Sequence, residues 1–407
     1  MTACRQIIKT AGWAACVTAS VAWICAVTGC TPAATKEPVA ARNVPLDFAW
    51  NFASSITNNP IDMSDRCLAQ KAVVLAYLAE GDVETARACA VTIEDWSRGV
   101  SLAAVAEWYA SHGEPAKAEA MLPQLDACGF LAHDWQREFL RLAILRVHAL
   151  LGRGKDVAQS AATFDARSKL GGDVAVNLAV ALARTGRVDE ATGILAGLSK
   201  TNGMNTADSS VKGYLDLITV GKLDPSVVTQ VLAKAWAATD FVSPPRSWDL
   251  QLQVIDALVK NGYNEGALQY LKDVSPKIVA AAKLPPEVQS AMLCRGAVLW
   301  KKLGDPLQGE VLRGEAEKSV ERRLELIFKP DAYAKIAEVF AQSGDLAQAR
   351  IWYNRALDLA ITLVNSRPRA LAGVDVCVSL AGHKEVIDAD IQKRLERLAG
   401  TFDARQP

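Results

Sequence analysis

The sequence lacks the features by which many enzymes and nucleic-acid-binding proteins are identified. Its 407 residues carry 45 basic and 45 acidic side chains, so no net charge attracts the chain to nucleic acid or acidic lipid. Only four residues are histidine, and neither an H-E-x-x-H nor a C-x-x-C motif occurs. A catalytic metal site, a bound cofactor and nucleic-acid binding are therefore not expected, and no G-x-S-x-G motif indicates a hydrolase nucleophile.

Aromatic residues are also scarce, at 6% of a chain that is 50% hydrophobic. Alanine, valine and leucine must then supply most of the core, which is typical of closely packed helices. Of the nine cysteines only five lie beyond residue 30, an odd number that cannot pair completely within one chain. The composition predicts an all-α protein with a large core and no disulfide framework.

The N-terminus has the organisation of an export signal. Only Arg5 and Lys9 are charged among the first thirteen residues, and residues 14–27 are apolar or small. Fourteen residues are few for a helix that spans a membrane, so we predict a signal peptide over residues 1–29. An ordinary secretory peptide and a short anchor helix are the alternatives.

The apolar run ends in Val27-Thr28-Gly29-Cys30, which resembles the lipobox of bacterial lipoprotein signal peptides. The resemblance implies cleavage before Cys30 and lipidation of its thiol with fatty acyl chains such as palmitate. Two or three acyl chains anchor a protein stably to a membrane. Thr31 replaces the Asp that retains enteric lipoproteins in the inner membrane, which favours the outer membrane, facing the periplasm. Residues 30–46, with prolines at 32, 38 and 45, are predicted to be a flexible tether.

The remaining residues, 47–407, contain an internal repeat. Each copy has a bulky residue four positions before a glycine, a small residue seven before it and an alanine five after it. Five clear copies place the glycine at 81, 113, 186, 262 and 344, and weaker copies at 152, 221, 304 and 382. The spacing predicts two helices joined by a turn at the glycine. Prolines at 115, 225 and 306 indicate where second helices begin.

This spacing resembles that of tetratricopeptide repeats. The first copy carries it at Val74, Tyr77, Gly81, Ala86 and Ala90, and comparable copies surround Gly113 and Gly344. The resemblance implies an α-solenoid of eight to nine helix-turn-helix units whose concave face binds a protein or peptide. A polar break near residue 205 leaves open a division into two helical subdomains.

Mapping the concave face of that family onto this sequence gives eight charged residues. Three of them, Lys260, Lys301 and Lys302, predict a local surface that attracts anions; the alternative is an ordinary solvated helix surface. The eight are Lys71, Glu107, Arg184, Asp256, Lys260, Lys301, Lys302 and Glu338.

Signal, tether and repeats together predict a non-enzymatic, lipid-anchored scaffold that binds another protein in the bacterial cell envelope. Its role there would be assembly, secretion or maintenance of the envelope. Two alternatives remain at this stage. One is an all-α toroid enzyme that acts on glycans, which needs exposed aromatic residues and convergent carboxylates. The other is a solute-binding or uptake lipoprotein built on repeats.

The lipobox predicts that Cys30 is the site of lipid attachment. Cys30→Ala removes the thiol that receives the diacylglyceryl group, so unprocessed precursor should accumulate. Metabolic labelling with a fatty-acid analogue measures this, and labelling should fall to background. Labelling equal to that of the parent chain would contradict the prediction.

Overall fold

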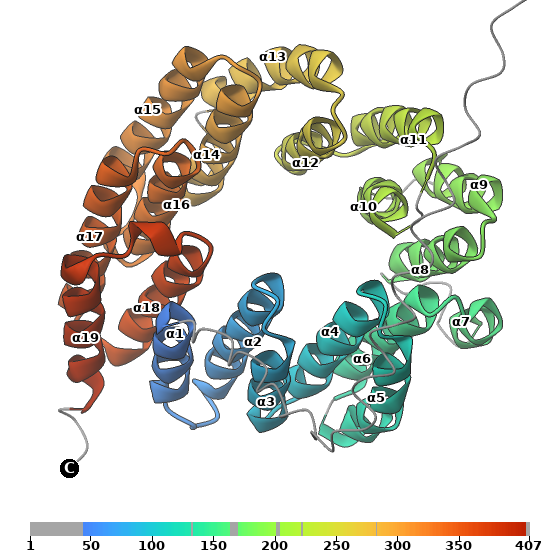
Figure 1. Cartoon of the computed structure of the whole chain (residues 1–407), viewed down its shortest axis with the longest axis horizontal. Helices are drawn as coiled ribbons and strands as arrows, with labels where there is room; N and C mark the ends of the chain where they lie inside the picture. Colours follow the sequence, from blue (N-terminus) through green and yellow to red (C-terminus); the bar gives the residue numbers. More distant parts are fainter. Residues whose placement is uncertain are drawn as a thin grey trace, which may run out of the picture. The chain divides into compact units, whose positions relative to one another are not determined.

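The computed structural model describes residues 44–131, 133–162, 170–200, 204–220, 223–281 and 283–403. In this part of the chain every regular element is helical, and helices alternate between an inner and an outer layer (Figure 1). The inner helices are α2 (Met63–Ala79), α4 (Ser97–Ser111), α6 (Asp134–Leu150), α8 (Gly171–Arg184), α10 (Met204–Val220), α12 (Arg246–Lys260), α14 (Pro286–Lys302), α16 (Lys329–Gln342) and α18 (Ser366–Ala381). The outer helices are α1 (Val44–Ser55), α3 (Val83–Thr92), α5 (Pro115–Ala127), α7 (Gly154–Ala161), α9 (Val188–Lys200), α11 (Pro225–Ala238), α13 (Asn264–Ala280), α15 (Pro306–Arg323), α17 (Leu346–Thr362) and α19 (Ala389–Asp403). Short 3₁₀ turns are η1 (Cys128–Leu131), η2 (Thr239–Phe241), η3 (Leu326–Phe328) and η4 (Lys384–Val386).

The turns between inner and outer helices share one backbone geometry. Gly81 has a φ of 79°, a left-handed conformation that costs glycine little, and the Asp82 N–H donates to the Tyr77 carbonyl at 2.9 Å. The same hydrogen bond across five residues recurs at the next copies, for example from Asp345 to Phe340. Left-handed glycines occur at 81, 113, 152, 186, 262, 304 and 344. The glycines of all five clear copies and of two weaker ones are therefore confirmed as the ends of helices.

The alanine of each clear copy lies where two helices approach most closely. Ala86, Ala118, Ala191, Ala267 and Ala349 are all fully buried. A methyl group is the largest side chain that this spacing accepts without overpacking. Pro115, Pro225 and Pro306 begin α5, α11 and α15, as their positions in the sequence predict. The chain is thus an all-α tandem array of helix-turn-helix units.

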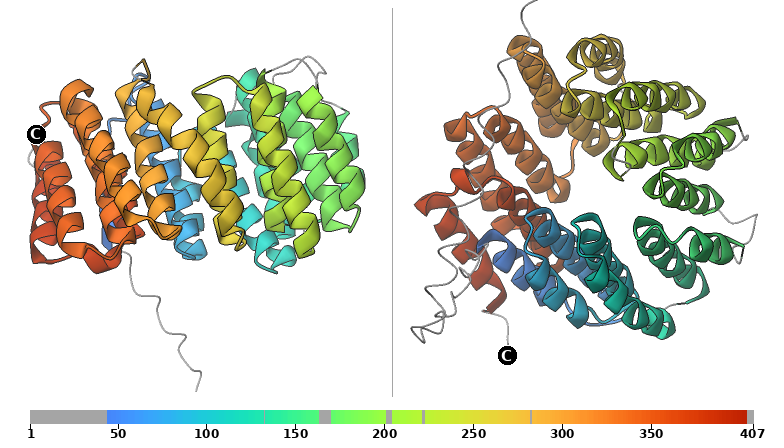
Figure 2. Two further views of the ribbon diagram at one scale, coloured as in Figure 1. Left: turned by 90° about the horizontal axis from the view of Figure 1, so that it is seen from above. Right: turned by 45° about the vertical axis from the view of Figure 1, so that its right-hand side comes forward.

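The inner helices form a closed series of contacts. Each packs against the next from α2 to α18, and α18 packs back against α2, so the unit Asn43–Pro407 is a ring (Figure 1). α10 packs against both α8 and α9, so the described helices continue as one unit across residue 205. In the side view of Figure 2 the helices stand side by side, and their loops alternate between two edges of the ring.

The N-terminal helix completes the last repeat. α19 packs mainly against α17 and α1, while α1 occupies the place beside α18 that an outer helix would take. Gly382, after α18, accordingly has a right-handed φ of −77° and makes a different turn from the other copies. α1 begins at Val44, three residues before the predicted start of the repeat domain at residue 47.

Side chains from both ends of the unit hold this closure. Phe52 of α1 packs on Gly373 of α18, where an added Cβ would lie 2.7 Å from the ring, and on Phe402 of α19 at 5.6 Å between ring centroids. Arg367 of α18 pairs with Asp62 at 2.9 Å, just before α2. At the opposite edge Lys384 pairs with Glu80 at 2.7 Å. Residues more than 300 positions apart are thereby neighbours.

The predicted signal peptide, residues 1–29, and the predicted lipidation site, Cys30, lie outside the described residues. Among the described residues no helix is long and apolar enough to span a membrane. Cys67, Cys89, Cys128, Cys294 and Cys377 are free thiols. No disulfide joins the cysteines of the described residues.

The closure predicts that Gly373→Ala destabilises the whole ring. Its new methyl group would overlap the buried Phe52 ring, so we expect a loss of about 1–3 kcal/mol in the free energy of unfolding. Thermal and denaturant unfolding measure the change. The control is Gly193→Ala in α9, where an added Cβ meets no atom within 4 Å and should stabilise the helix slightly. Equal melting of the two variants would contradict the packing of α1 on α18.

Candidate functional site

Charged side chains line the inner helices as a series of ion pairs. Arg246 of α12 lies 2.8 Å from Asp208 of α10 and 2.5 Å from Asp249 of its own helix. Asp249 in turn lies 2.6 Å from Arg295 of α14. Lys212 of α10 also pairs with Asp208, so three cations share two carboxylates and most of the charge in this part of the inner face is paired. The pairs join three successive inner helices.

The predicted lysine surface is largely neutralised by the same pairing. Lys260 and Lys302 come together as the sequence predicts, but they share the carboxylate of Asp256, at 2.7 and 3.6 Å. Lys301 is directed away from them, pairs with Glu310 of α15 at 2.7 Å and has only 14% of its side chain exposed. The three lysines therefore do not form one free cationic surface.

The other predicted residues occupy different environments. The Arg184 Nε donates to the Leu150 carbonyl at 2.9 Å, so its guanidinium links the ends of α8 and α6. Glu338 of α16 accepts a hydrogen bond from the Ser379 hydroxyl, and burial raises the pKa of its carboxyl. Lys71 lies on α2 between two exposed leucines, at 68 and 75. Of the eight predicted residues, Glu107 alone lies in the pocket described next.

A pocket of about 270 Å³, here called the inner pocket, opens on α4, α6, α8 and α10. Arg146 of α6 reaches Asp216 of α10 at 3.0 Å, and the Ser209 hydroxyl donates to Asp173 of α8 at 2.7 Å. Lys212 is paired with Asp208 at 2.7 Å. The pocket is lined by Glu107, Phe139, Leu142, Ala143, Arg146, Asp173, Val176, Asn177, Lys212 and Asp216.

Two carboxylates of the inner pocket, Glu107 and Asp216, have raised pKa values. Burial raises the pKa of Glu107 to about 7, although the Arg146 guanidinium acts in the opposite direction. Burial also raises the pKa of Asp216, again against the attraction of Arg146. Among the described residues neither Glu107 nor Asp173 is in an ion pair, whereas Arg146 and Lys212 both are. Glu107 and Asp173 are thus the charged groups of the pocket that no ion pair engages among the described residues.

An aromatic cluster adjoins the inner pocket at its α6 side. Trp135 and Phe139 stand one turn apart on α6, and Trp96 from the start of α4 contacts both, at 5.6 and 6.3 Å between ring centroids. Trp135 is 58% exposed and Phe139 43% exposed, and Phe139 also lines the inner pocket. Trp135, Phe139, Leu142 and Arg146 lie at helical spacings on one face of α6. The apolar side chains on that face of α6 therefore lead directly to the charged side chain of Arg146.

Of the residues that line the inner pocket, the sequence analysis predicted only Glu107. Glu107, Asp256 and Glu338 all stand six positions before the turn glycine. Arg146 stands six positions before Gly152, in a copy whose spacing is weaker. The same six-residue spacing, applied to the weaker copy around Gly152, would have identified Arg146. Asp173 and Asp216 do not occupy that repeat position, and only the structure brings them to the pocket.

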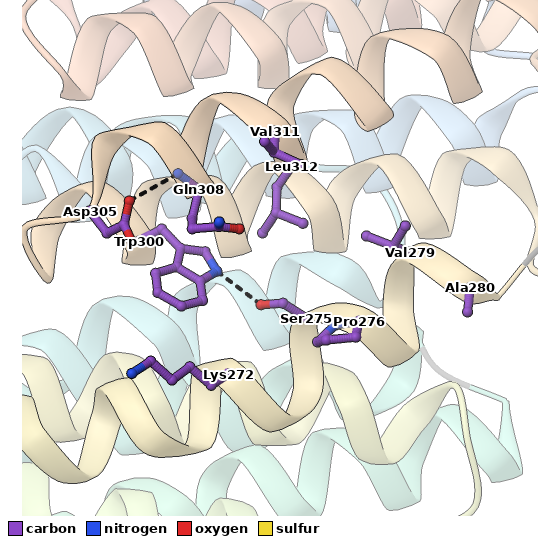
Figure 3. Close-up of a pocket in the computed structure, with 10 residues that line it drawn as sticks. All are labelled: Lys272, Ser275, Pro276, Val279, Ala280, Trp300, Asp305, Gln308, Val311 and Leu312. Atoms are coloured by element: carbon purple, nitrogen blue, oxygen red, sulfur yellow. Dashed lines mark hydrogen bonds between the residues drawn. The ribbon is translucent and has the colours of Figure 1, made fainter.

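A second hollow lies on the outer side of the ring, between α13 and α15 (Figure 3). It has a volume of about 480 Å³ and is walled mainly by apolar side chains, including Pro276, Val279 and Val311. At its base the Trp300 indole donates to the Ser275 hydroxyl at 3.0 Å, so this indole is satisfied within the fold. The hollow carries few free polar groups, and the inner pocket is the better candidate for specific recognition.

No metal-binding group of three or more histidine, cysteine or acidic side chains occurs in the part of the chain that the structure describes. Neither a protein-family model nor a curated protein sequence matches the chain. A solved structure described as a "circular tandem repeat protein with novel repeat topology and enhanced subunit contact surfaces" is 13% identical to it. That alignment covers 89% of this chain and 96% of the other, with a TM-score of 0.24. A TM-score this low does not show a shared fold, so the fold is assigned from the contacts between the helices described above.

The raised pKa of Glu107 predicts a pH-dependent stability. Between about pH 4.5 and 7 the folded protein retains this proton while the unfolded chain loses it, so stability falls as the pH rises through 7. Glu107→Gln stays neutral and should gain stability relative to the parent, by on the order of 1–3 kcal/mol at pH 8. Denaturant unfolding at pH 5 and pH 8 measures the gain, which should be small at pH 5. Glu265→Gln, at an exposed site on α13, is the control and should change little between the two pH values; a matching profile for both variants would refute the burial of Glu107.

Proposed function

We propose that this helical repeat protein is a lipid-anchored scaffold that binds a segment of another protein at the inner pocket. The supporting observation is that the exposed aromatic cluster of Trp96, Trp135 and Phe139 continues directly into a pocket of carboxylates. Exposed tryptophan is enriched at the centres of protein interfaces, because it buries much apolar area at little entropic cost. The proposal extends no further than binding; no catalytic step is assigned to the chain.

The charges of the inner pocket favour a particular partner chemistry. Arg146 and Lys212 are already in ion pairs with carboxylates, while Glu107 and Asp173 are in no ion pair among the described residues. A lysine or arginine of the partner would meet these carboxylates, and an adjacent apolar side chain would cover Phe139. We therefore expect a bound segment with a basic residue beside an aromatic or aliphatic one. Binding would also lower the pKa of Glu107 by adding a positive charge to that of Arg146.

The location of this scaffold follows from the N-terminal sequence. The lipobox-like ending at Cys30 and the proline-containing tether support attachment to the outer membrane, facing the periplasm. Assembly, secretion and maintenance of the envelope are the processes in which an anchored protein-binding ring would act.

Glycan binding is a second candidate for the same site. Exposed aromatic rings and convergent carboxylates are the two features that a carbohydrate cleft needs, and both occur here in Trp135 and in Glu107 with Asp216. A raised pKa on one carboxyl is also typical of a glycosidase acid. Peptide binding remains the first proposal, because the pocket carries cations as well as carboxylates.

Site-specific photo-cross-linking in intact membranes tests the proposal. A benzophenone amino acid at Phe139 should give an adduct with one protein, whereas the same probe at Val91, on the outer helix α3, should not. The double variant Glu107→Gln, Asp173→Asn keeps the shape of the pocket but removes its charge, and the adduct should fall at least several-fold. Mass spectrometry of the adduct should locate a basic residue next to an apolar one.

Three outcomes would overturn or redirect this assignment. Equal cross-linking from Phe139 and Val91 would show that the inner pocket has no special role. An adduct unaffected by the double variant would refute recognition by the carboxylates. Adducts of glycan mass at Phe139 would replace the first proposal by the second.

A further inference from the structure

One edge of the ring carries exposed apolar side chains on three consecutive loops. Ile61, before α2, is 81% exposed, and Val364, between α17 and α18, is 82% exposed. Leu326, Ile327 and Phe328 form η3, before α16, and are 45–56% exposed. These five residues are here called the apolar rim. Each lies in a loop that leads from an outer helix into an inner helix, so all five belong to the same edge.

Contacts between the loops make the apolar rim continuous. η3 packs against α18, at whose start Val364 lies. Arg367, three residues after Val364, pairs with Asp62, the residue after Ile61. The closure of the ring therefore brings residue 61 beside residues 326–364. Without closure these loops would lie at opposite ends of the chain.

Two charged groups beside the apolar rim, Asp62 and Lys329, are bonded within the protein. The Asp62 carboxylate accepts hydrogen bonds from Thr57 and Asn59 and pairs with Arg367. Lys329, directly after Phe328, lies 3.5 Å from Glu321. These charges are therefore engaged, and the rim has apolar side chains rather than a free basic patch to offer a partner.

We propose that the apolar rim inserts into the headgroup boundary of a lipid bilayer, so that the ring rests on the membrane by this edge. The side chains lie on three loops and line neither of the hollows described above, whereas docking to a folded protein favours a concave, complementary surface. A bilayer is planar and yields around single side chains, and aromatic and branched residues suit its interface. This inference rests on the proposed function for the presence of a membrane beside the protein.

The proposed anchor is long enough for this orientation. α1 runs toward the edge of the apolar rim, so its first residue, Val44, lies at the opposite edge. The 14 residues from Cys30 to Val44 reach at most about 46–50 Å. The 17 residues of α2, which set the height of the ring, span about 25 Å. The lipid at Cys30 can therefore reach the membrane on which the apolar rim rests.

Environment-sensitive labelling of the processed full-length chain in phosphatidylethanolamine–phosphatidylglycerol vesicles tests this proposal. Val364→Cys is labelled with a nitrobenzoxadiazole fluorophore, and Leu307→Cys is the matched control, since Leu307 is 78% exposed beside the Gly304 turn at the opposite edge. Of the five cysteines at positions 67–377, four are buried and Cys89 is half-buried, so labelling is selective for the new thiol. Brominated lipids should quench the label at 364 at least three-fold more than the label at 307, equally at 50 and 500 mM salt.

Variants of the apolar rim supply a second readout. Ile61→Ser with Phe328→Ser should reduce quenching at position 364 several-fold, whereas Leu307→Ser should leave it unchanged. Equal quenching at 364 and 307, or none at 364, would overturn the proposal. A blue shift at 364 that needs no vesicles and grows with protein concentration would also overturn it, by assigning the apolar rim to a second copy of the chain.

These measurements test the proposed lipid anchor and the proposed role of the apolar rim separately. If Cys30→Ala is acylated and retained on vesicles like the parent, the anchor proposal is wrong whatever the label at 364 reports. If the parent is retained but its label at 364 is quenched no more than that at 307, the apolar rim proposal is wrong and the anchor stands.

Discussion

The insertion of α1 beside α18 is the contact on which the remaining arrangement depends. Tandem helical repeats ordinarily interact only with their neighbours, so the two terminal repeats each leave one apolar face uncovered. Here Phe52 and the other buried residues of α1 cover the face of α18, while α19 covers the outer side of α1 and α17. Gly373 permits the close approach because it has no side chain between the two helices. The ring therefore has no terminal repeat that must be solvated.

Closure also explains how surfaces far apart in sequence become single features. The apolar rim combines residues 326–364 with residue 61, and the ion pairs of Arg367 and Lys384 join α18 and η4 to the start and end of α2. The inner pocket is built differently, from four consecutive repeats. Its position near the closure point means that α4 is supported from one side by α6 and from the other by α2, which α18 holds in turn. A ligand in the inner pocket would accordingly stabilise more of the ring than the helices it touches.

The repeat fold could be predicted from the sequence because its signals are local. A left-handed glycine, a buried alanine five residues later and a proline at the first helical position each act within one helix-turn-helix unit, and every clear copy has the expected turn. Closure could not be predicted in this way, since it depends on the small rotation between units summed over the whole chain. The spacing of the repeats carries no direct measure of that rotation. Gly382 shows the limit, because its turn changes once α1 takes the place of the expected outer helix.

The candidate site was predictable only in part, for reasons of charge rather than of fold. Residue positions indicated that Lys260 and Lys302 would lie on one face, but not that both would pair with the single carboxylate of Asp256. This pairing reduces the expected positive charge of the surface without reversing it. At the inner pocket Arg146 and Lys212 are both in ion pairs, whereas among the described residues the carboxylates of Glu107 and Asp173 are in none. A chain of zero formal charge can in this way present carboxylates that no ion pair engages, and the proposed preference for a basic segment rests on these groups rather than on the net charge.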